Sequence, residues 1–354
     1  MYDGLSKAVI NLINLESNYK SVRAKNTLAV VKANAYGHGA TKIARKLLEI
    51  GCSSFCVANV EEAYELRKSL LPAVPEIVVL GYVPPDFAPE CLLYAVTPTI
   101  FNYAHANSFA RFLPENGRLK AYIAYDTGMN RKGIVSRGEC LAAIRETEKI
   151  FSVEKLEIVG AYTHFFATDC GKRGEALTKR QCENFCKILK AFPSAFSSVS
   201  LSSRRSFFGE DVRAGLTLYG YPGGKPVMKL CSVVVDVRDV KAGEYVGYGL
   251  IRAKKDMTLA LVPLGYADGI LQAYSGKKVK IKTENGEFYG TVFGRVCMDF
   301  TLIDVSEKPI RPGDEVVFFG DEVSQAQAIA GKNLPVHELL TAVSARVRRI
   351  YTTS

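Results

Sequence analysis

The sequence predicts a parallel (β/α)8 barrel of the TIM type followed by a mainly antiparallel β domain. Between residues 27 and 213, short apolar segments rich in β-branched residues alternate with longer amphipathic segments. Beyond residue 225 the long amphipathic segments give way to closely spaced strand patterns. We therefore expect a barrel over residues 8–225 and a β domain over 226–354, with residues 1–7 packing against the second domain.

Eight strands are expected in the first domain, separated by segments of helical length. Between the first two strands, Ile43, Ala44 and Leu47 share one helical face, and Gly51 follows as a C-cap. Similar helical patterns occupy residues 61–70, 138–150 and 179–192. Parallel strands need right-handed crossovers, so eight such units favour a closed barrel. The strands are expected at residues 27–33, 54–58, 76–80, 93–97, 119–125, 156–162, 197–201 and near 212.

The second domain is built from strand patterns without long helices between them. The dipeptide Asn285-Gly286 predicts a two-residue hairpin turn between two of them. Lys278, Lys280 and Lys282 alternate along one strand and are expected to face solvent together. The five strands are expected at residues 230–237, 257–264, 278–282, 287–293 and 315–319.

Composition excludes several classes of protein. Hydrophobic residues make up 48% and charged residues 23%, which is ordinary for a globular chain and argues against disorder. The net charge of +10 comes from scattered basic residues without a nucleic-acid-binding motif, so we expect a solvated surface rather than a nucleic-acid partner. No apolar run approaches the ~20 residues that cross a bilayer, and residues 1–4 lack the start of a secretory signal. We expect a cytoplasmic protein with no membrane partner.

The cysteines and histidines indicate no metal site. Nine cysteines form an odd set without zinc-finger spacing, and only four histidines are present. Reduced thiols are the expected state of these cysteines in a reducing compartment.

A lysine at the end of the first strand is the first candidate for chemistry. It lies in the segment Ala-Val-Val-Lys-Ala-Asn-Ala-Tyr-Gly-His-Gly, residues 29–39. Catalytic groups of barrels lie at the carboxyl ends of the strands, and burial there would lower the pKa of the Lys32 amine and favour a nucleophile or Schiff-base former. A lone lysine in a strand is more often a surface residue, but the glycine-rich aromatic loop that follows favours the functional interpretation.

This segment resembles the cofactor-lysine signature of alanine racemases, pyridoxal-phosphate enzymes of the barrel type. Six other segments resemble family motifs in the same order, so the similarity extends from near residue 8 to Tyr351 and covers both domains. These segments are Asp-Thr-Gly-Met-Asn-Arg-Lys-Gly at 126–133, Tyr-Thr-His-Phe at 162–165, Val-Arg-Ala-Gly-Leu at 212–216, Gly-Tyr-Gly at 247–249, Gly-Tyr-Ala-Asp-Gly at 265–269 and Gly-Arg-Val-Cys-Met-Asp at 294–299.

The resemblance implies a two-base mechanism with pyridoxal 5′-phosphate as cofactor. Lys32 would hold the cofactor and then act as a base on one face of the α-carbon, while Tyr248 of the partner subunit would act on the other face. An unperturbed tyrosine is a poor base at neutral pH, and His164 at the end of the sixth strand is the candidate that assists it. Arg213 would donate a hydrogen bond to the pyridine nitrogen and, because a guanidinium stays protonated, weaken the ring as an electron sink.

The remaining implied residues bind the phosphate and the substrate. Tyr36, Ser203, Gly215 and Leu216 match positions that bind the cofactor phosphate. Arg131 would neutralise the substrate carboxylate, assisted by the backbone amide of Met298, which with Tyr266 would come from the partner subunit. The resemblance therefore implies a homodimer with shared active sites and a small amino-acid substrate.

The sequence departs from the family pattern at three places. Many members carry a carbamylated lysine two residues before the Asp-Thr-Gly-Met motif, where this chain has Ala124. The usual Asn-Ser pair before the phosphate loop is Ser202-Ser203. A phosphate-contacting tyrosine near the C-terminus is replaced by His337, which would keep a cofactor contact and leave room for a hydroxymethyl side chain. Serine racemases of the vancomycin-resistance type also resemble alanine racemases and also lack this tyrosine.

These residues leave several functions open. The first is an alanine racemase that supplies D-alanine for peptidoglycan. The second is a serine racemase or a broad alanine and serine racemase. A non-catalytic pyridoxal-phosphate carrier would have a single barrel, which residues 226–354 argue against. A barrel decarboxylase or D-threonine aldolase is a further alternative, although the aldolase would need a metal site. The last alternative, a nucleic-acid-binding protein, is supported by the net charge alone.

Overall fold

The computed structural model describes residues 4–22, 24–168, 170–203, 206–207, 209–331 and 334–353. The chain forms two compact units. The barrel unit comprises residues 20–33 and 40–215, and the sheet unit comprises residues 1–19, 34–39 and 216–354. The division into domains at residues 225 and 226 remains a prediction.

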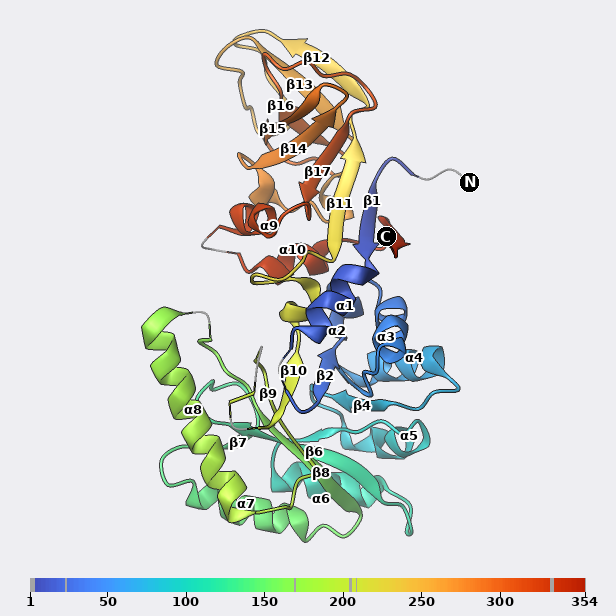
Figure 1. Ribbon diagram of the computed structural model, residues 1–354, viewed down its shortest axis with the longest axis vertical. Helices are drawn as coiled ribbons and strands as arrows, with labels where there is room; N and C mark the ends of the chain where they lie inside the picture. The colour runs from blue at the N-terminus through green and yellow to red at the C-terminus, as the bar shows by residue number, and fades with distance from the viewer. Residues whose placement is uncertain are drawn as a thin grey trace. The chain divides into compact units, whose positions relative to one another are not determined.

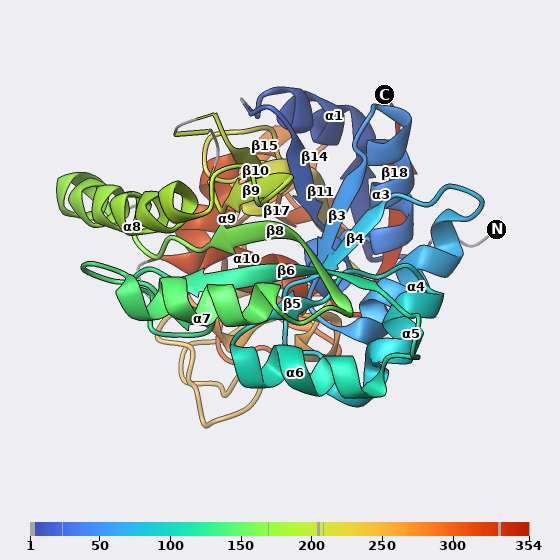
Figure 2. The same cartoon turned by 90° about the horizontal axis from the view of Figure 1, so that it is seen from below.

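The barrel unit contains the predicted eight parallel strands. They pair in the order β4-β3-β2-β10-β9-β8-β6-β5, and a parallel bridge between Val78 and Thr97 joins the two ends of this row. The barrel is therefore closed, which confirms the predicted fold class (Figure 2). The strands are β2 (Thr27–Val30), β3 (Ser54–Val57), β4 (Glu76–Val79), β5 (Thr99–Ile100), β6 (Leu119–Asp126), β8 (Leu156–Thr163), β9 (Ser198–Leu201) and β10 (Asp211–Ala214).

Helices cover the outside of these strands, as Figure 2 shows for α4, α5, α6 and α7. Helix α4 illustrates why they begin where they do: Asn59 accepts a hydrogen bond from the Glu62 amide, and acidic residues occupy the first turn. The helices are α3 (Ala40–Glu49), α4 (Val60–Leu70), α5 (Ala88–Leu93), α6 (Tyr103–Phe112), α7 (Leu141–Phe151) and α8 (Gly171–Ala191), with the 3-10 turn η1 (Pro85–Phe87) and the short strand β7 (Ile134–Val135) beside β6.

One barrel strand differs from the prediction. Residues 93–97 were expected to form a strand, but Leu93 is the last residue of α5 and the strand β5 begins at Thr99. Cys91 is buried on the inner face of this short helix. The apolar residues before Val96 therefore belong to a helix that packs on the barrel, and a two-residue strand is too short to give a periodic pattern of its own.

The sheet unit is built on a nine-stranded sheet (Figure 1). Its order is β12-β13-β16-β15-β14-β17-β11-β1-β18, and every pair is antiparallel except β1 with β18. The mainly antiparallel second domain is thus confirmed. The strands are β1 (Lys7–Asn11), β11 (Met228–Val233), β12 (Asp236–Val240), β13 (Met257–Val262), β14 (Lys278–Thr283), β15 (Gly286–Val292), β16 (Thr301–Asp304), β17 (Glu315–Phe319) and β18 (Arg348–Thr352).

Short helices complete this unit. They are α1 (Leu12–Lys20), α9 (Val323–Ala330), α10 (Val336–Ala342), η2 (Leu216–Tyr219), η3 (Tyr266–Asp268) and η4 (Gln272–Tyr274). Over the described part of the chain, none of the helices is both long enough and apolar enough to cross a membrane. All nine cysteines are free thiols.

Two details of the sheet correct the predictions. The hairpin between β14 and β15 pairs Thr283 with Gly286, so its turn residues are Glu284 and Asn285, one position earlier than expected. Lys280 does not face solvent with its neighbours: it is 8% exposed and forms ion pairs within 3.6 Å of three carboxylates, on Glu287, Asp321 and Glu322. Two of these acids lie about forty residues away in sequence, and the alternation of the strand does not reveal them.

Candidate active site

Lys32 lies just beyond strand β2, at the carboxyl end of the barrel strands. The Val31 amide donates to the Cys56 carbonyl at 2.9 Å, which extends the pairing of β2 with β3 up to the lysine. Burial of the half-buried side chain lowers the pKa of Lys32, and the positive charges of Arg131 and Arg213 add to this effect, while Glu62 opposes it. A lysine in these surroundings holds a larger fraction of neutral amine near pH 7 than a free lysine does.

Glu62 connects the backbone after this lysine with the backbone after strand β3. It lies in the first turn of α4, where Oε1 accepts the Ala33 amide at 2.7 Å and Oε2 accepts the Ala58 amide at 2.8 Å. The helical pattern over residues 61–70 includes Glu62 but indicates no role for it. Its position in a first turn directly after a barrel strand is the signal that points to it.

The chain after Lys32 forms a left-handed helical turn, α2 (Lys32–Tyr36). The φ angles of Ala33, Asn34, Ala35 and Tyr36 lie between 51° and 54°. Each non-glycine residue in this conformation costs about 1–2 kcal/mol, because Cβ approaches the following carbonyl. The Gly39 amide closes the turn by donating to the Asn34 carbonyl at 2.9 Å. Strain of this kind is concentrated at functional sites, where surrounding contacts maintain it.

Arg131 follows a tight turn at the end of β6. Asp126 holds this turn: Oδ1 accepts the amides of Gly128 at 2.9 Å and Asn130 at 3.1 Å, and Oδ2 accepts the Arg131 amide at 3.0 Å. The Arg131 side chain is exposed. Asp126 thus fixes the backbone from which the guanidinium projects, a role that the sequence analysis did not assign.

Arg213 is buried inside β10, and both of its Nη atoms donate hydrogen bonds within the barrel unit. One guanidinium nitrogen, Nη2, donates to the Thr163 carbonyl at 2.7 Å, and Nη1 donates to both the carbonyl and the hydroxyl of Ser200 at 3.2 Å. The guanidinium carbon lies 4.1 Å from the centre of the Tyr162 ring. These contacts give the guanidinium a fixed orientation.

His164 follows strand β8 and carries no charge at neutral pH. Burial is the first cause, followed by the positive charges of Arg213 and Arg131, and together they lower the pKa of His164 to about 3. Its carbonyl accepts a hydrogen bond from the Gln181 side chain at 2.9 Å. A neutral imidazole can donate or accept a hydrogen bond but supplies no positive charge to a neighbouring group.

A narrow cavity of about 10 Å³ lies between the ends of β6 and β8. Ala124 occupies its wall where many family members carry a lysine, and Gly133 packs so tightly that a Cβ on it would lie 2.5 Å from the Ala124 carbonyl oxygen. Space of this size holds one water-sized group. The cavity is lined by Ala124, Tyr125, Asp126, Met129, Arg131, Lys132, Tyr162 and His164.

The residues expected to bind the phosphate follow the last two barrel strands. Ser202 and Ser203 come directly after β9, and the Ser202 hydroxyl accepts the Phe165 amide at 3.1 Å. Gly215 and Leu216 come directly after β10, where Leu216 begins the turn η2. These are the positions at which barrels bind phosphate through backbone amides.

Within the sheet unit, Tyr36 and His337 lie near each other. Their ring centres are 6.4 Å apart and nearly perpendicular, and the Tyr36 ring also lies 4.8 Å from that of Tyr219. His337 is exposed at the start of α10. The histidine that replaces the family tyrosine therefore shares a cluster with a residue predicted to bind the same group.

Tyr248, Tyr266 and Met298 lie on loops at the surface of the sheet unit and are 66%, 47% and 52% exposed. Two of these loops are joined by backbone hydrogen bonds from the Tyr266 amide to the Cys297 carbonyl and from the Ala267 amide to the Met298 carbonyl. Arg346 bridges both loops as well, at 3.2 Å from Asp268 and 2.9 Å from Asp299.

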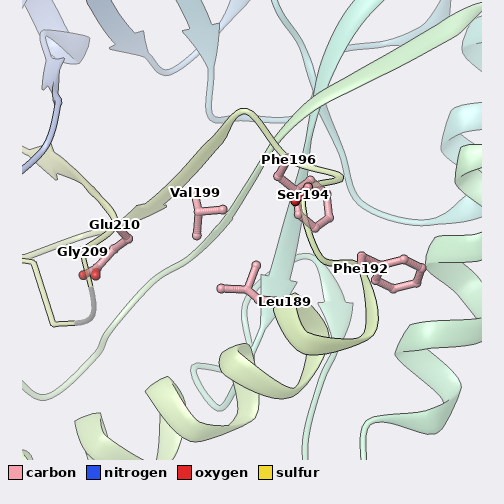
Figure 3. Close-up of a pocket in the computed structure, with 7 residues that line it drawn as sticks. All are labelled: Leu189, Phe192, Ser194, Phe196, Val199, Gly209 and Glu210. Atoms are coloured by element: carbon pink, nitrogen blue, oxygen red, sulfur yellow. The ribbon is translucent and has the colours of Figure 1, made fainter.

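A larger cavity, of about 240 Å³, lies at the other end of the barrel (Figure 3). It is lined around Val199 near the start of β9 and Glu210 just before β10, at the amino ends of strands whose carboxyl ends lead to Ser203 and Gly215. In Figure 3 the side chains of Leu189, Phe196 and Val199 surround it. This cavity is larger than the one beside Arg131, but it lies away from the predicted site residues and is not the candidate site.

The structure gathers part of the predicted site within each unit. In the barrel unit, the charges of Lys32, Arg131 and Arg213 act on one another and on His164. In the sheet unit, the rings of Tyr36 and His337 lie 6.4 Å apart, and backbone hydrogen bonds join the segments that contain Tyr266 and Met298. Tyr248 lies on a third surface loop, where a Cβ on the adjacent Gly249 would lie 2.8 Å from Arg295 Nε.

Comparison with known proteins gives one consistent result. The family description "Alanine racemase, N-terminal domain" matches residues 10–222, and "Alanine racemase, C-terminal domain" matches residues 227–351. An alanine racemase from Clostridium perfringens is 34% identical, with 97% of this chain and 94% of that protein covered. The solved structure of an alanine racemase from Clostridium difficile has a TM-score of 0.86 at 28% identity, covering 99% and 97% of the two chains. One from Bartonella henselae, with covalently bound pyridoxal phosphate, has a TM-score of 0.84 at 29% identity, covering 99% and 100%.

Proposed function

This chain belongs to the alanine racemase family, and from that premise we propose how its residues carry out the reaction. It is an amino-acid racemase, an isomerase that depends on pyridoxal 5′-phosphate. We propose that it interconverts L- and D-alanine and supplies D-alanine for peptidoglycan in the cytoplasm. The observation that carries the proposal is the placement of Lys32, with its lowered pKa, among fixed cations at the carboxyl end of a closed barrel.

The residues of the barrel unit fit this cofactor. Lys32 offers an amine for its aldehyde, Arg213 offers an oriented guanidinium, and the backbone after β9 and β10 offers amides to a phosphate dianion. When bound, the cofactor ring spreads the negative charge that is left when the α-proton of the amino acid is removed. Tyr36, Ser203, Gly215, Leu216 and His337 are the proposed phosphate contacts, and Arg213 the proposed contact of the pyridine nitrogen.

Inversion at the α-carbon needs a proton donor and a proton acceptor on opposite faces. We assign one face to the Lys32 amine, whose lowered pKa favours proton acceptance near neutrality. The other face is assigned to the Tyr248 hydroxyl of a second subunit. His164 is proposed to orient the cofactor through a neutral hydrogen bond.

A homodimer follows from this assignment. Tyr248, Tyr266 and Met298 project from the surface of the sheet unit, where a second copy of the chain would cover them. Arg131 would bind the substrate carboxylate from one subunit, and the Met298 amide would approach it from the other. The dimer would then contain two equal sites.

Serine is proposed as a second substrate because of His337. The imidazole is smaller than the phenol of the family pattern and lies 6.4 Å from Tyr36, so the cluster has more room for a hydroxymethyl group. This is a difference in specificity only, since the proton transfers would be the same.

The test is to incubate the pyridoxal-phosphate-loaded protein separately with L-alanine and L-serine and to quantify both enantiomers by chiral chromatography. Rapid conversion of alanine supports the main proposal. A serine turnover several thousand-fold below that of alanine would remove the second substrate. If the cofactor binds and neither amino acid is racemised, the two-base assignment fails.

A further inference from the structure

Lys132 is a cation in the site for which the proposed mechanism has no use. It follows Arg131 after strand β6, and its half-buried side chain crosses the mouth of the barrel toward β4 and β5. There Nζ donates to the Leu80 carbonyl and lies 5.4 Å from the centre of the Phe101 ring. Both partners are neutral, so neither balances the charge of the ammonium group.

No carboxylate forms an ion pair with Lys132 or with Arg131 among the residues that the structure describes. Asp126 lines the same cavity, but its oxygens accept three backbone amides and face Arg137 at 3.5 Å. Two adjacent cations therefore face one small cavity without an anion from the protein. Arg131 is exposed, but the Lys132 side chain is half-buried, and holding its ammonium group beside a second cation is unfavourable unless an anionic ligand compensates for it.

The charged groups that act most strongly on Lys132 are positive. Burial and then Arg131, Arg213 and Lys32 lower the pKa of Lys132 to about 8. Burial raises the pKa of the Cys56 thiol to about 12, which leaves it neutral. The ammonium form of Lys132 thus predominates at neutral pH although the surroundings disfavour it, and a bound monoanion would stabilise it.

We propose that Lys132 pairs with Arg131 to bind the carboxylate of the amino-acid substrate. The cavity beside them, of about 10 Å³, admits one water-sized group and so accommodates a single carboxylate oxygen rather than a whole ligand. This inference rests on the proposed function, because it concerns the substrate of that reaction. It adds a specificity-determining residue, since a ligand with an amine but no carboxylate would gain nothing from Lys132.

The test compares Lys132→Met with Lys132→Arg in the cofactor-loaded protein, with Lys149→Met on the exposed face of α7 as the control. Propionate serves as the probe because it has the carboxylate of alanine without the amine. In Lys132→Met, the KM for alanine and the Ki for propionate should both rise by roughly tenfold or more, as expected when a charge-assisted hydrogen bond is lost. The kcat should change less than about threefold, Lys132→Arg should restore both constants, and Lys149→Met should leave all three unchanged.

Three results would overturn the assignment. An unchanged Ki in Lys132→Met removes Lys132 from the carboxylate site. A fall in kcat with unchanged KM and Ki indicates a structural role. The third result concerns chloride. If the wild-type rate depends on chloride at constant ionic strength, and Lys132→Met abolishes this dependence without changing the Ki for propionate, then Arg131 and Lys132 bind a halide ion rather than the substrate carboxylate.

A measurement on the unaltered protein covers the case in which Lys132→Met does not fold. Acetic anhydride labels amines, and mass spectrometry of the peptide that contains Lys132 reports its reactivity. Propionate should slow this labelling and neutral propionamide should not, whereas equal labelling with propionate, with propionamide and with neither contradicts the proposal. If the wild-type protein racemises no amino acid, the proposed function fails, and the labelling result still shows whether Lys132 meets a carboxylate.

Discussion

His38 is a fully buried imidazole that the fold keeps neutral. Its Nδ1 lies 2.9 Å from the carbonyl oxygens of both Ala35 and Tyr36, while Nε2 has no hydrogen-bond partner among the described residues. Burial lowers the pKa of His38 from 6.5 to about 4. Between these two values the unfolded chain binds a proton that the folded chain does not, so stability falls as the pH falls below 6.5.

This difference predicts a specific loss of stability in acid. Lowering the pH from 7.5 to 5.0 should reduce the free energy of unfolding by about 2 kcal/mol through His38 alone, because in this range the unfolded chain binds a proton at His38 that the folded chain does not. In His38→Gln the difference between the urea unfolding free energies at the two pH values should be smaller by that amount. The pKa of His164 is lowered to about 3, and this residue contributes equally to the pH dependence of the wild-type protein and of His38→Gln. An identical pH dependence of stability in these two proteins would therefore contradict the prediction.

Asp126 gives a second prediction for a single residue. An asparagine at this position keeps one acceptor oxygen, so Asp126→Asn cannot satisfy the three amides of the turn before Arg131. We expect a loss of about 1–2 kcal/mol in unfolding free energy and a raised KM for alanine. Asp86→Asn, on the exposed turn η1, is the matched control and should change neither value. Wild-type stability in Asp126→Asn would show that the turn does not depend on the carboxylate.

At the scale of elements, the left-handed turn α2 changes the effect on stability of replacing alanine by glycine. Glycine adopts positive φ without the steric cost that alanine incurs, although it loses more entropy on folding. We therefore expect Ala33→Gly to be neutral or to stabilise the protein by up to about 1 kcal/mol. Ala142→Gly, at an exposed position of the right-handed helix α7, should cost about 1 kcal/mol. Urea unfolding of the two variants measures the contrast, and equal destabilisation would mean that the strain at Ala33 is negligible.

The elements also show what the sequence can and cannot predict. Seven of the barrel strands and the antiparallel character of the sheet could be predicted from the periodicity of the apolar residues. Three of the nine sheet strands, β1, β16 and β18, were not predicted, and the strand expected at residues 230–237 is divided between β11 and β12. The fourth barrel strand could not be predicted, because β5 is only two residues long and α5 precedes it. The left-handed turn is also hidden from the pattern, since alanine, asparagine and tyrosine do not favour four consecutive positive φ angles.

Some residues of the candidate site could also be predicted from the sequence, and others could not. Lys32, Arg131, His164 and Arg213 could be predicted because family motifs contain them and strand ends place them. The neutral state of His164 could not, because the cations that lower its pKa come from other strands of the barrel. Glu62 and Lys132 were missed because their side chains contact segments that follow other strands, at Ala33 and Leu80 respectively.

At the scale of the whole molecule, a shared site predicts complementation between two inactive variants. If Lys32 of one subunit works with Tyr248 of the other, then Lys32→Ala and Tyr248→Ala homodimers are both nearly inactive. After mixed refolding, each heterodimer has one intact site, and the mixture should recover about a quarter of wild-type activity, because half of the dimers are mixed and half of their sites are intact. Activity that stays at the level of the separate variants would place both residues in the same subunit's site.

The position of β1 has a consequence for how the protein is made. This strand, only a few residues from the N-terminus, pairs with β11 on one side and with β18, which ends two residues before the C-terminus, on the other. During synthesis β1 is made more than 300 residues before its neighbour β18. The barrel strands are complete more than 130 residues earlier, by Ala214. Until β18 is made, the finished barrel is therefore joined to a sheet unit in which one edge of β1 is open, and an open strand edge can pair with another chain.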